Sequence, residues 1–219
     1  MDSREIIARR AALFFEDGNV VNLGIGIPTM AAAYVPKGVE VYLQSENGMF
    51  HVGPPPEAGK EDKDVIDAGG KPATLLPGAA CFDSSMSFAL IRGGHLDATL
   101  LGALEVDQEG NLANWIVPGK MVPGMGGAMD LVSGAKKVII TMEHCAKDGK
   151  PKILKKCTLP LTAVGSVTHI VTELCVMEKT PEGLVLKEVA PGVTVEDVKA
   201  KTEAEIVVPD KVVPMAGVS

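Results

Sequence analysis

The sequence predicts an α/β fold in which flanking helices cover one open, mainly parallel sheet. Helix-like and strand-like segments alternate along most of the chain, as they do in parallel sheets with crossover helices. Of the 219 residues, 46% are hydrophobic and only 4% are aromatic, which suits a compact core of small aliphatic side chains. Neither a fixed-period repeat nor a low-complexity linker divides the chain, so residues 1–219 are predicted to form a single domain.

The first predicted element is a helix over residues 2–15. Ile7, Ala11 and Phe14 recur at i, i+4 and i+7, which is the spacing of one helical face. Asp2 can accept hydrogen bonds from the first free N–H groups of the helix. We therefore expect an amphipathic helix at this end of the chain.

A strand, a glycine turn and a second helix are predicted next. Residues 20–23, which are apolar except for Asn22, predict a short buried strand, as in parallel sheets. After the turn, Pro28 suits the first turn of a helix that reaches about residue 35, because an N–H at that position has no helical partner. Residues 39–44 then predict the second strand.

The remaining elements are predicted from capping residues, apolar runs and turn signals. In chain order they are a helix at 84–92, a strand at 95–101, a hairpin turn at 107–111, a glycine-rich loop at 118–130, strands at 138–142, 157–161, 168–177 and 184–189, and a helix at 194–202. The last two strands are expected to pair through the turn at 181–183.

Polar residues follow directly on the predicted strand 39–44. Ser45, Glu46, Asn47 and Gly48 stand at its carboxyl end, where open parallel sheets place their ligands. Glu46 is therefore a candidate catalytic carboxylate, and Asn47 and Gly48 are candidate substrate-binding residues. From position alone, a solvated strand end or a cap is the more frequent role of such a glutamate.

The glycine turn before the second helix is a candidate anion site. The free N–H groups beside Gly24 and Gly26 can bind a phosphate or a carboxylate. Position 29 is Thr29, so the GxGxxG fingerprint is broken, and no P-loop motif occurs. NAD and ATP are therefore disfavoured, and a plain strand-to-helix turn remains an equal alternative.

The glycine-rich loop offers a second set of backbone donors. Gly126 and Gly127 carry no Cβ, so their N–H groups can approach a reacting carbonyl closely, as in an oxyanion hole. A hinge is the alternative role for adjacent glycines. Upstream, residues 53–64 hold three consecutive prolines and many charges, which predict an exposed loop able to close over a site.

Other chemistry is less well supported. The four histidines show no metal-ligand spacing, so no metal site is expected; they are His51, His95, His144 and His169. Four lysines between positions 150 and 156 could grip phosphates, although a solvated face is the more frequent role of such a cluster.

Charge and hydropathy exclude further classes of partner. Lys and Arg total 21 against 28 Asp and Glu, and a net charge of -7 argues against nucleic acid, whose phosphates require a basic surface. Apolar runs reach about six residues, far below the ~20 that span a bilayer. Four cysteines without CxxC spacing, and a charged start without an apolar signal segment, lead us to expect a soluble, cytoplasmic protein.

Five collinear motifs resemble the B-type chain of the 3-oxoacid CoA-transferases, closest to the acetoacetate and butyrate CoA-transferase type. The motifs are NLGIGIPT (22–29), QSENG (44–48), GALEVDQEGNLANW (102–115), PGMGGAMDL (123–131) and KKCTLPLT (155–162). The resemblance runs from about residue 5 to residue 214. One departure is Ala163, where related sequences often have glycine, and it affects local packing more than chemistry.

The resemblance implies a fold of the CoA-transferase type and a function. Glu46 would be the nucleophile, Gly127 a backbone oxyanion donor, and CoA would be a substrate with no prosthetic group required. A homologous A subunit would complete the enzyme, in an α2β2 heterotetramer. The reaction would move CoA between short-chain acids such as acetoacetate, butyrate and acetate through a covalent glutamyl-CoA thioester.

Two other functions remain open. The chain could be an acyl-CoA hydrolase or a sugar-phosphate isomerase on the same kind of fold, with Glu46 as a general base that leaves no covalent intermediate. It could also be a non-catalytic, CoA-binding subunit whose partner carries all the chemistry.

Overall fold

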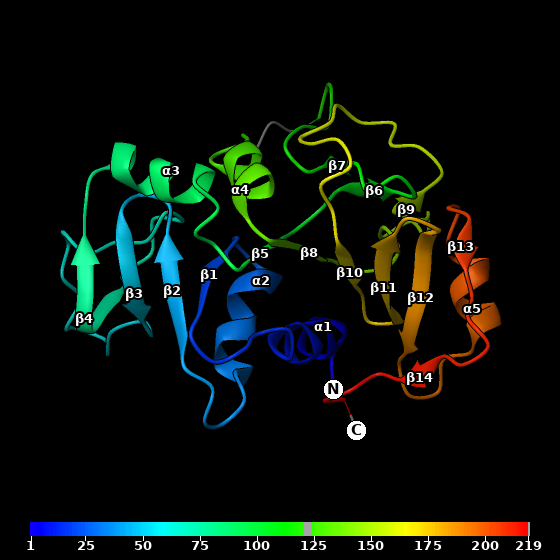
Figure 1. Ribbon diagram of the computed structural model, residues 1–219, viewed down its shortest axis with the longest axis horizontal. Coiled ribbons are helices and arrows are strands. Elements are labelled where there is room, and N and C mark those ends of the chain that lie inside the picture. The colour runs from blue at the N-terminus through cyan, green and yellow to red at the C-terminus, as the bar shows by residue number, and fades with distance from the viewer. Residues whose placement is uncertain (121–123, 219) are drawn as a thin grey trace.

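In the computed structural model, which describes residues 1–120 and 124–218, a large mixed sheet forms the centre of the protein (Figure 1). Its strands are β1 (Asn19–Leu23), β2 (Val41–Ser45), β3 (Met49–Gly53), β4 (Thr74–Cys81), β5 (Ala98–Leu101), β8 (Lys137–Thr141), β10 (His169–Val171), β11 (Cys175–Thr180), β12 (Gly183–Val189), β13 (Ile206–Val207) and β14 (Val213–Pro214). A second, small sheet contains β6 (Glu105–Asp107), β7 (Leu112–Ala113) and β9 (Ile153–Leu154).

The large sheet is mainly parallel. Its order is β13-β12-β11-β10-β8-β5-β1-β2-β3-β4, and β14 also pairs with β12. The central run from β2 through β1, β5 and β8 to β10 is parallel throughout. Antiparallel pairs occur on both sides of this run, at β2–β3–β4 and at β10–β11–β12. The predicted α/β class with a mainly parallel sheet is therefore confirmed.

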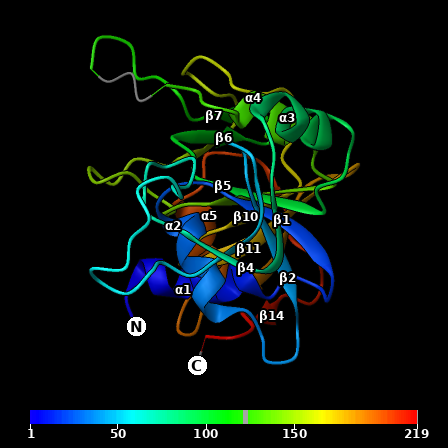
Figure 2. The ribbon, with the colours of Figure 1, turned by 90° about the vertical axis from the view of Figure 1, so that its left-hand side faces the viewer.

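Helices cover both faces of the sheet. They are α1 (Ser3–Ala12), α2 (Ile27–Met30), the 3-10 helix η1 (Ala31–Tyr34), α3 (Ser84–Arg92), α4 (Ala128–Gly134) and α5 (Val195–Ala200). Figure 2 shows α3 and α4 on one side of β1 and β5, and α1 and α2 on the other. Neighbouring residues of β8 show the same division, because Ile139 packs with α1 whereas Val138 and Ile140 pack with α3 and α4.

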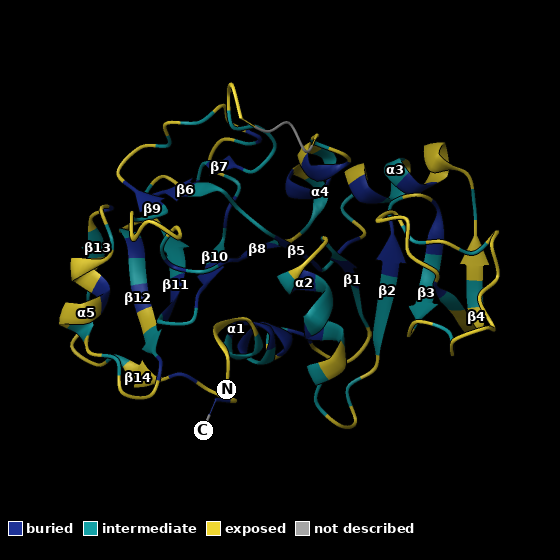
Figure 3. Ribbon diagram, turned by 180° about the vertical axis from the view of Figure 1, so that it is seen from behind, coloured by how far each residue is buried: buried dark blue, intermediate teal, exposed yellow. Residues whose placement is uncertain are grey.

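Burial follows the strand order. The central strands β5 and β8 are almost fully buried, whereas most residues of the edge strand β4 are exposed (Figure 3). In the described part of the chain, no helix is long and apolar enough to cross a bilayer.

Capping residues set the helix starts as predicted. Asp2 accepts from the Arg4 N–H at 2.7 Å, Asp83 accepts from the Met86 N–H at 2.8 Å, and Thr194 forms a capping box with residue 197. The helices predicted at 2–15, 84–92 and 194–202 are confirmed, the first and last being shorter than predicted. The helix predicted at 28–35 is split between α2 and η1.

The strand predicted at 157–161 is wrong. Backbone N–H groups that would pair with a neighbouring strand donate to carboxylates instead. Asp107 accepts from the Cys157 N–H, and Glu105 accepts from the N–H groups of both Thr158 and Leu159, at 2.7–3.0 Å. The segment therefore follows these side chains as irregular structure, and the nearest strand is β9.

The single strand predicted at 168–177 is two antiparallel strands, β10 and β11. Thr172 reverses the chain between them, because its N–H donates to the Cys175 carbonyl at 2.9 Å and its hydroxyl accepts from the Cys175 N–H at 3.1 Å. The segment lacks glycine and proline, so its sequence shows no turn signal, and the turn depends on the hydrogen bonds of one threonine. The predicted pairing of the following strand, β12, is confirmed, and so is the hairpin turn at 107–111 between β6 and β7.

Several elements were missed. β3 and β4 extend the sheet beyond β2, one before and one after the loop predicted at 53–64, and like β13 and β14 they lie in segments without a predicted element. The loop predicted at 118–130 is wrong from Ala128 onward, because α4 begins there, with Gly127 as the residue before its first turn. Residues 121–123 of that predicted loop lie outside the described residues.

His144 follows β8 and is fully buried. Its Nδ1 lies 3.0 Å from the Thr172 hydroxyl, and its Nε2 lies 2.9 Å from the Thr202 hydroxyl. Burial lowers the pKa of His144 to about 4, and Lys201 and Lys152 add to this effect by charge repulsion.

We predict that His144 makes the stability of the protein fall in mild acid. The neutral ring is favoured in the folded chain and can protonate at its ordinary pKa of 6.5 in the unfolded chain. Above pH 6.5 this group therefore does not lower the free energy of unfolding. As the pH falls from 6.5 toward 4, the free energy of unfolding decreases by about 3 kcal/mol in total. Urea denaturation at pH 7, 5.5 and 4.5 should show a shallower decline in His144→Gln than in the original chain. Equal declines would contradict this role.

Candidate active site

Glu46 lies in a tight turn between β2 and β3, at the carboxyl edge of the parallel strands. Gly48 closes this turn, with a φ of 116° and an N–H that donates to the Ser45 carbonyl at 3.0 Å. A Cβ at position 48 would collide with the Phe82 carbonyl oxygen. Because the Phe82 N–H also donates to the Gly48 carbonyl at 2.9 Å, the turn is fastened to the segment that leads into α3. Gly48 therefore shapes the turn that carries Glu46.

A buried polar network supports the end of β2. The Gln44 side chain accepts from Asn22 Nδ2 of β1 at 2.8 Å and donates to the Ser87 hydroxyl of α3 at 2.8 Å. Asn22 also donates to the Gln44 carbonyl at 3.1 Å. All three residues are at most 4% exposed, so their hydrogen bonds replace those to water. Loss of one of these bonds would leave a buried polar group without a partner and would destabilise the fold. The network joins β1, β2 and α3 two residues before Glu46.

Gly127 meets the Glu46 carboxylate. Its N–H donates to Glu46 Oε1 at 3.0 Å, across a sequence separation of 81 residues. A Cβ at position 127 would lie 2.8 Å from Glu46 Oε2, so only glycine leaves room for this contact. A Cβ on Gly126 would lie 3.4 Å from Glu46 Oε1. The structure thus brings together the carboxylate and the glycine pair that the sequence singled out separately.

Asn47 and Ser45, the neighbours of Glu46, hold another segment. Asn47 Nδ2 donates to the Ile66 carbonyl at 2.8 Å, and the Ser45 hydroxyl accepts from the Ala68 N–H at 2.9 Å. The segment after the proline loop is therefore attached on both sides of Glu46. In the structure, the Asn47 side chain binds this segment. The predicted contact of Asn47 with substrate stays a prediction.

Gly24 and Gly26 lie on the neighbouring strand end. The Gly24 N–H donates to the Leu100 carbonyl at 2.8 Å, and a Cβ there would lie 3.0 Å from the same oxygen. Gly24 thus allows close packing of β1 against β5. Gly26 is exposed, with a φ of 95° and open space around its Cα. Within the described residues, no hydrogen bond joins either glycine to Glu46.

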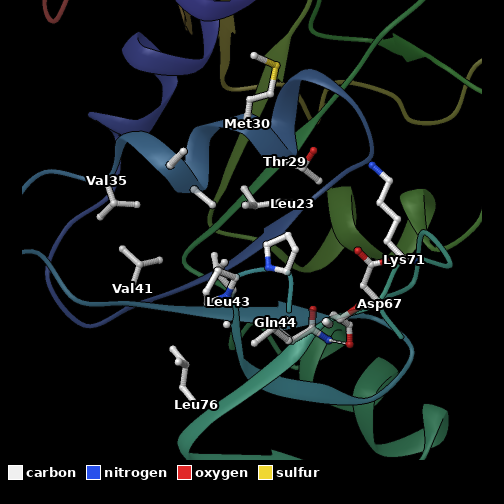
Figure 4. Close-up of a pocket in the computed structure, with 18 of the residues that line it drawn as sticks. Leu23, Thr29, Met30, Val35, Val41, Leu43, Gln44, Asp67, Lys71 and Leu76 are labelled. Atoms are coloured by element: carbon white, nitrogen blue, oxygen red, sulfur yellow. Dashed lines mark hydrogen bonds between the residues drawn. The ribbon is translucent and has the colours of Figure 1, made fainter. Parts of the chain in front are cut away.

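A cavity of about 610 Å³ lies between α2, η1, β2 and the segment that follows β3. It is mostly apolar, and Figure 4 shows Lys71 and Asp67 at one end, with Val41 and Leu76 far from Lys71. Pro54 and Pro55 of the predicted loop form part of its wall. This cavity was not predictable from the sequence, because it depends on residues from separate elements. Among the described residues, no group of three or more His, Cys, Asp or Glu side chains could hold a metal ion.

The fold and the site together define a class of protein: an α/β protein that holds a carboxylate against a backbone N–H at the carboxyl edge of its sheet. A family model described as coenzyme A transferase matches residues 4–201. The chain therefore belongs to the coenzyme A transferase family.

The chain is similar to several named members of this family. It is 59% identical to the beta chain of the acetate CoA-transferase of Escherichia coli over 204 residues, which are 93% of each chain. It is 49% identical to the B chain of a probable succinyl-CoA:3-ketoacid coenzyme A transferase of Bacillus subtilis, over 96% of this chain and 98% of that one. It also matches a mitochondrial succinyl-CoA:3-ketoacid coenzyme A transferase of Mus musculus at 53% identity, but spans only 41% of its length.

Solved structures give the same fold. The acyl-CoA transferase YdiF of Escherichia coli O157:H7 superposes with a TM-score of 0.78 at 25% identity, and the match covers 99% of this chain and 44% of that one. Glutaconate coenzyme A-transferase from Acidaminococcus fermentans superposes with a TM-score of 0.74 over 100% of this chain and 90% of its own. At 16% identity, the second likeness shows the fold alone.

We predict that Gly127→Ala displaces the Glu46 carboxylate. The added methyl group would need the space that Oε2 occupies, so the carboxylate must move away from the N–H of residue 127. Displacement of a reacting group by about 1 Å can lower a rate by about 100-fold. CoA transfer by the chain together with an A-type partner would measure the loss. Met129→Ala, an exposed change in the same helix, should keep the activity of the original chain, and a similar loss in both variants would contradict the prediction.

Proposed function

We propose that this chain is the B-type, catalytic subunit of a CoA-transferase that moves CoA between a short-chain acyl-CoA and a short-chain carboxylic or 3-oxo acid. Residues 1–219 would act as one domain. The observation that carries the proposal is the 3.0 Å hydrogen bond from the Gly127 N–H to the Glu46 carboxylate. Relatives named as acetate and 3-ketoacid CoA-transferases support acetate and 3-oxo acids such as acetoacetate as substrates, and butyrate stays a proposal from the sequence motifs.

In the first step, the Glu46 carboxylate attacks the carbonyl carbon of the acyl-CoA. A carbon–oxygen bond forms, the carbon–sulfur bond breaks, and CoA leaves as its thiolate. The product is a mixed anhydride between the acyl group and Glu46. Glu46 suits this role because it stands at an open strand end and is only partly buried, within reach of a bound thioester.

In the second step, the CoA thiolate attacks the carbonyl carbon of Glu46. Negative charge then develops on an oxygen of Glu46 itself, and the Gly127 N–H already donates to such an oxygen. The first acid leaves as its carboxylate, and Glu46 is left as a CoA thioester. A second acid reverses both steps and departs with CoA. Each bond change is balanced by Glu46, CoA and the two acids, so CoA is a substrate and the scheme needs no prosthetic group.

The anhydride must be protected from water. Residues 53–64 stay our candidate for a closing loop, because residues 57–64 are all exposed, while Pro54 and Pro55 at the start of the loop reach the cavity wall. The attachments of Ile66 to Asn47 and of Ala68 to Ser45 supply a fixed end for such a movement, directly beside Glu46.

A partner subunit would complete the site. Relatives of this chain are named as beta or B chains of their enzymes, and the mouse relative has more than twice its length. Glu46 stands at an open edge, and Ile25 nearby on that edge is 68% exposed. We propose a homologous A subunit in an α2β2 heterotetramer. The cytoplasmic location stays a prediction from the sequence.

We predict that incubation with acetoacetyl-CoA or butyryl-CoA, in complex with the A-type partner, leaves a CoA adduct on Glu46. Mass spectrometry of peptides would locate it. Glu46→Gln should abolish both the adduct and CoA exchange, because an amide is a far poorer nucleophile than a carboxylate. Glu182→Gln, which changes an exposed carboxylate between β11 and β12, should retain both.

The outcome also separates the alternatives. A hydrolase or an isomerase that uses Glu46 as a base would turn over without an adduct. A non-catalytic subunit would keep its activity in Glu46→Ala. Exchange that survives Glu46→Gln would overturn the mechanism.

We predict that substrate protects the loop 53–64 from proteases. If the loop closes over a bound acyl-CoA, cleavage within it should slow several-fold when acyl-CoA is present, because a protease requires a mobile, accessible segment. Limited proteolysis followed by peptide mapping would measure the rate with and without substrate. Cleavage in the exposed turn at 181–182 serves as the internal control, and equal protection at both places would count against closure.

A further inference from the structure

The Gln44 side chain reaches the backbone of the turn that carries Glu46. Its Nε2 donates to the Ser45 carbonyl oxygen at 3.2 Å, in addition to the Ser87 hydroxyl at 2.8 Å. The same carbonyl oxygen accepts from the Gly48 N–H at 3.0 Å. One amide thus joins the peptide bond before Glu46 to α3, a helix that lies outside the turn.

The Ser45 carbonyl determines how the Gln44 amide is oriented. A carbonyl oxygen can only accept hydrogen bonds, so the part of the amide that faces it must be the NH2 group. The amide oxygen then faces Asn22, whose Nδ2 donates to it at 2.8 Å. Both N–H donors of Gln44 are therefore engaged within the protein, and Gln44 is only 4% exposed. This leaves no free amide donor for a substrate.

A fixed Ser45 carbonyl restricts the Glu46 side chain. The peptide group between Ser45 and Glu46 is planar, so the carbonyl also fixes the direction of the Glu46 N–H and the position of its Cα. Only the torsions of Glu46 itself lie between this point and the carboxylate, which accepts from the Gly127 N–H at 3.0 Å. Glu46 is thus held at two places, by Gly127 at its carboxylate and by Gln44 through its backbone.

The proposed reaction uses the position of the Glu46 carboxylate twice. The carboxylate first attacks a thioester, and its own carbonyl carbon is then attacked by the CoA thiolate. Both steps require the reacting atoms to be aligned beside the Gly127 N–H. Because Glu46 is only partly buried, packing alone does not fix its side chain, and the backbone before it has to be held.

We propose that Gln44 is a positioning residue for CoA transfer: its amide holds the Ser45 carbonyl and thereby keeps the Glu46 carboxylate at the Gly127 N–H. The proposal rests on the proposed function, because it assigns Gln44 to a reaction at Glu46. Gln44 acts through Glu46 and touches no substrate. Its loss therefore slows the chemistry at Glu46 and leaves the affinity for CoA unchanged.

Gln44→Met tests this role, because it removes both donors and keeps a side chain of similar length. In complex with the A-type partner and saturating acetoacetyl-CoA, the single-turnover rate of adduct formation on Glu46 should fall about tenfold or more, since a displacement of about 1 Å can cost about 100-fold. The dissociation constant for CoA, measured by calorimetry, should equal that of the original chain.

Ser87→Ala is the matched control, because it removes a hydrogen bond of the same amide and leaves the bond to the Ser45 carbonyl in place. Ser87 is fully buried, so this variant should also lower the midpoint of urea unfolding. It should nevertheless keep most of the rate of adduct formation. An equal loss of rate in Ser87→Ala and Gln44→Met would assign the effect to a general loosening of the network and contradict the positioning role.

Asn22→Asp is a second variant, which keeps Gln44 but reverses its amide. A carboxylate at position 22 repels the Gln44 oxygen and attracts its NH2 group, and the Ser87 hydroxyl can donate to the reversed oxygen. Only the Ser45 carbonyl then faces an acceptor. This variant should slow adduct formation as Gln44→Met does. A full rate in either variant, once urea unfolding shows that it is folded, overturns the proposal.

An NMR measurement separates this role from the proposed function, because it requires no reaction. In the full chain with isotope-labelled glycine, the Gly127 N–H signal reports the contact with Glu46, and its loss in Gly127→Ala identifies it. In Gln44→Met the signal should move toward its position in Glu46→Ala, whereas in Ser87→Ala it should stay near that of the original chain. An unmoved signal in Gln44→Met overturns the positioning role alone, and absence of a Glu46 adduct in the original complex overturns the proposed function alone.

Discussion

The contact between the Gly127 N–H and the Glu46 carboxylate is the constraint on which the site depends. It requires the end of β2 and the start of α4 to meet, and it excludes any side chain at position 127. The Gly48 turn and the buried network of Gln44 with Asn22 and Ser87 hold the Glu46 side of the contact. On the other side, α4 packs against α3, so both halves of the site are attached to the same pair of helices.

The carboxyl edge of the parallel strands gathers the remaining chemistry. Glu46 follows β2, the glycine turn follows β1, and a small pocket lined by Ile25, Gly102 and Thr141 lies where β5 and β8 end. Strands of one parallel run end on one side, so residues far apart in the chain become neighbours there.

Elements with strong local signals were predictable. The helices capped by Asp2, Asp83 and Thr194 follow from capping residues, and the central strands follow from short apolar runs. The errors arose where side-chain hydrogen bonds determine the backbone conformation. The carboxylates of Glu105 and Asp107 prevent a strand at 157–161, and the Thr172 hydroxyl stabilises a turn within a segment that has no glycine or proline. In the site, Glu46, Gly126 and Gly127 were predictable candidates, whereas the 610 Å³ cavity was not, because its wall combines residues of separate elements.

The sequence by itself determined the α/β class, the main crossover helices and the residue types able to do the chemistry, because periodicity, capping and turn formation act over a few residues. Only the tertiary structure decided which candidates meet. It placed the Gly127 N–H against the Glu46 carboxylate and assigned Gly24 to packing against β5. These choices depend on strand order and on contacts between residues far apart in the chain, 81 residues apart for Gly127 and Glu46, and no local pattern encodes them.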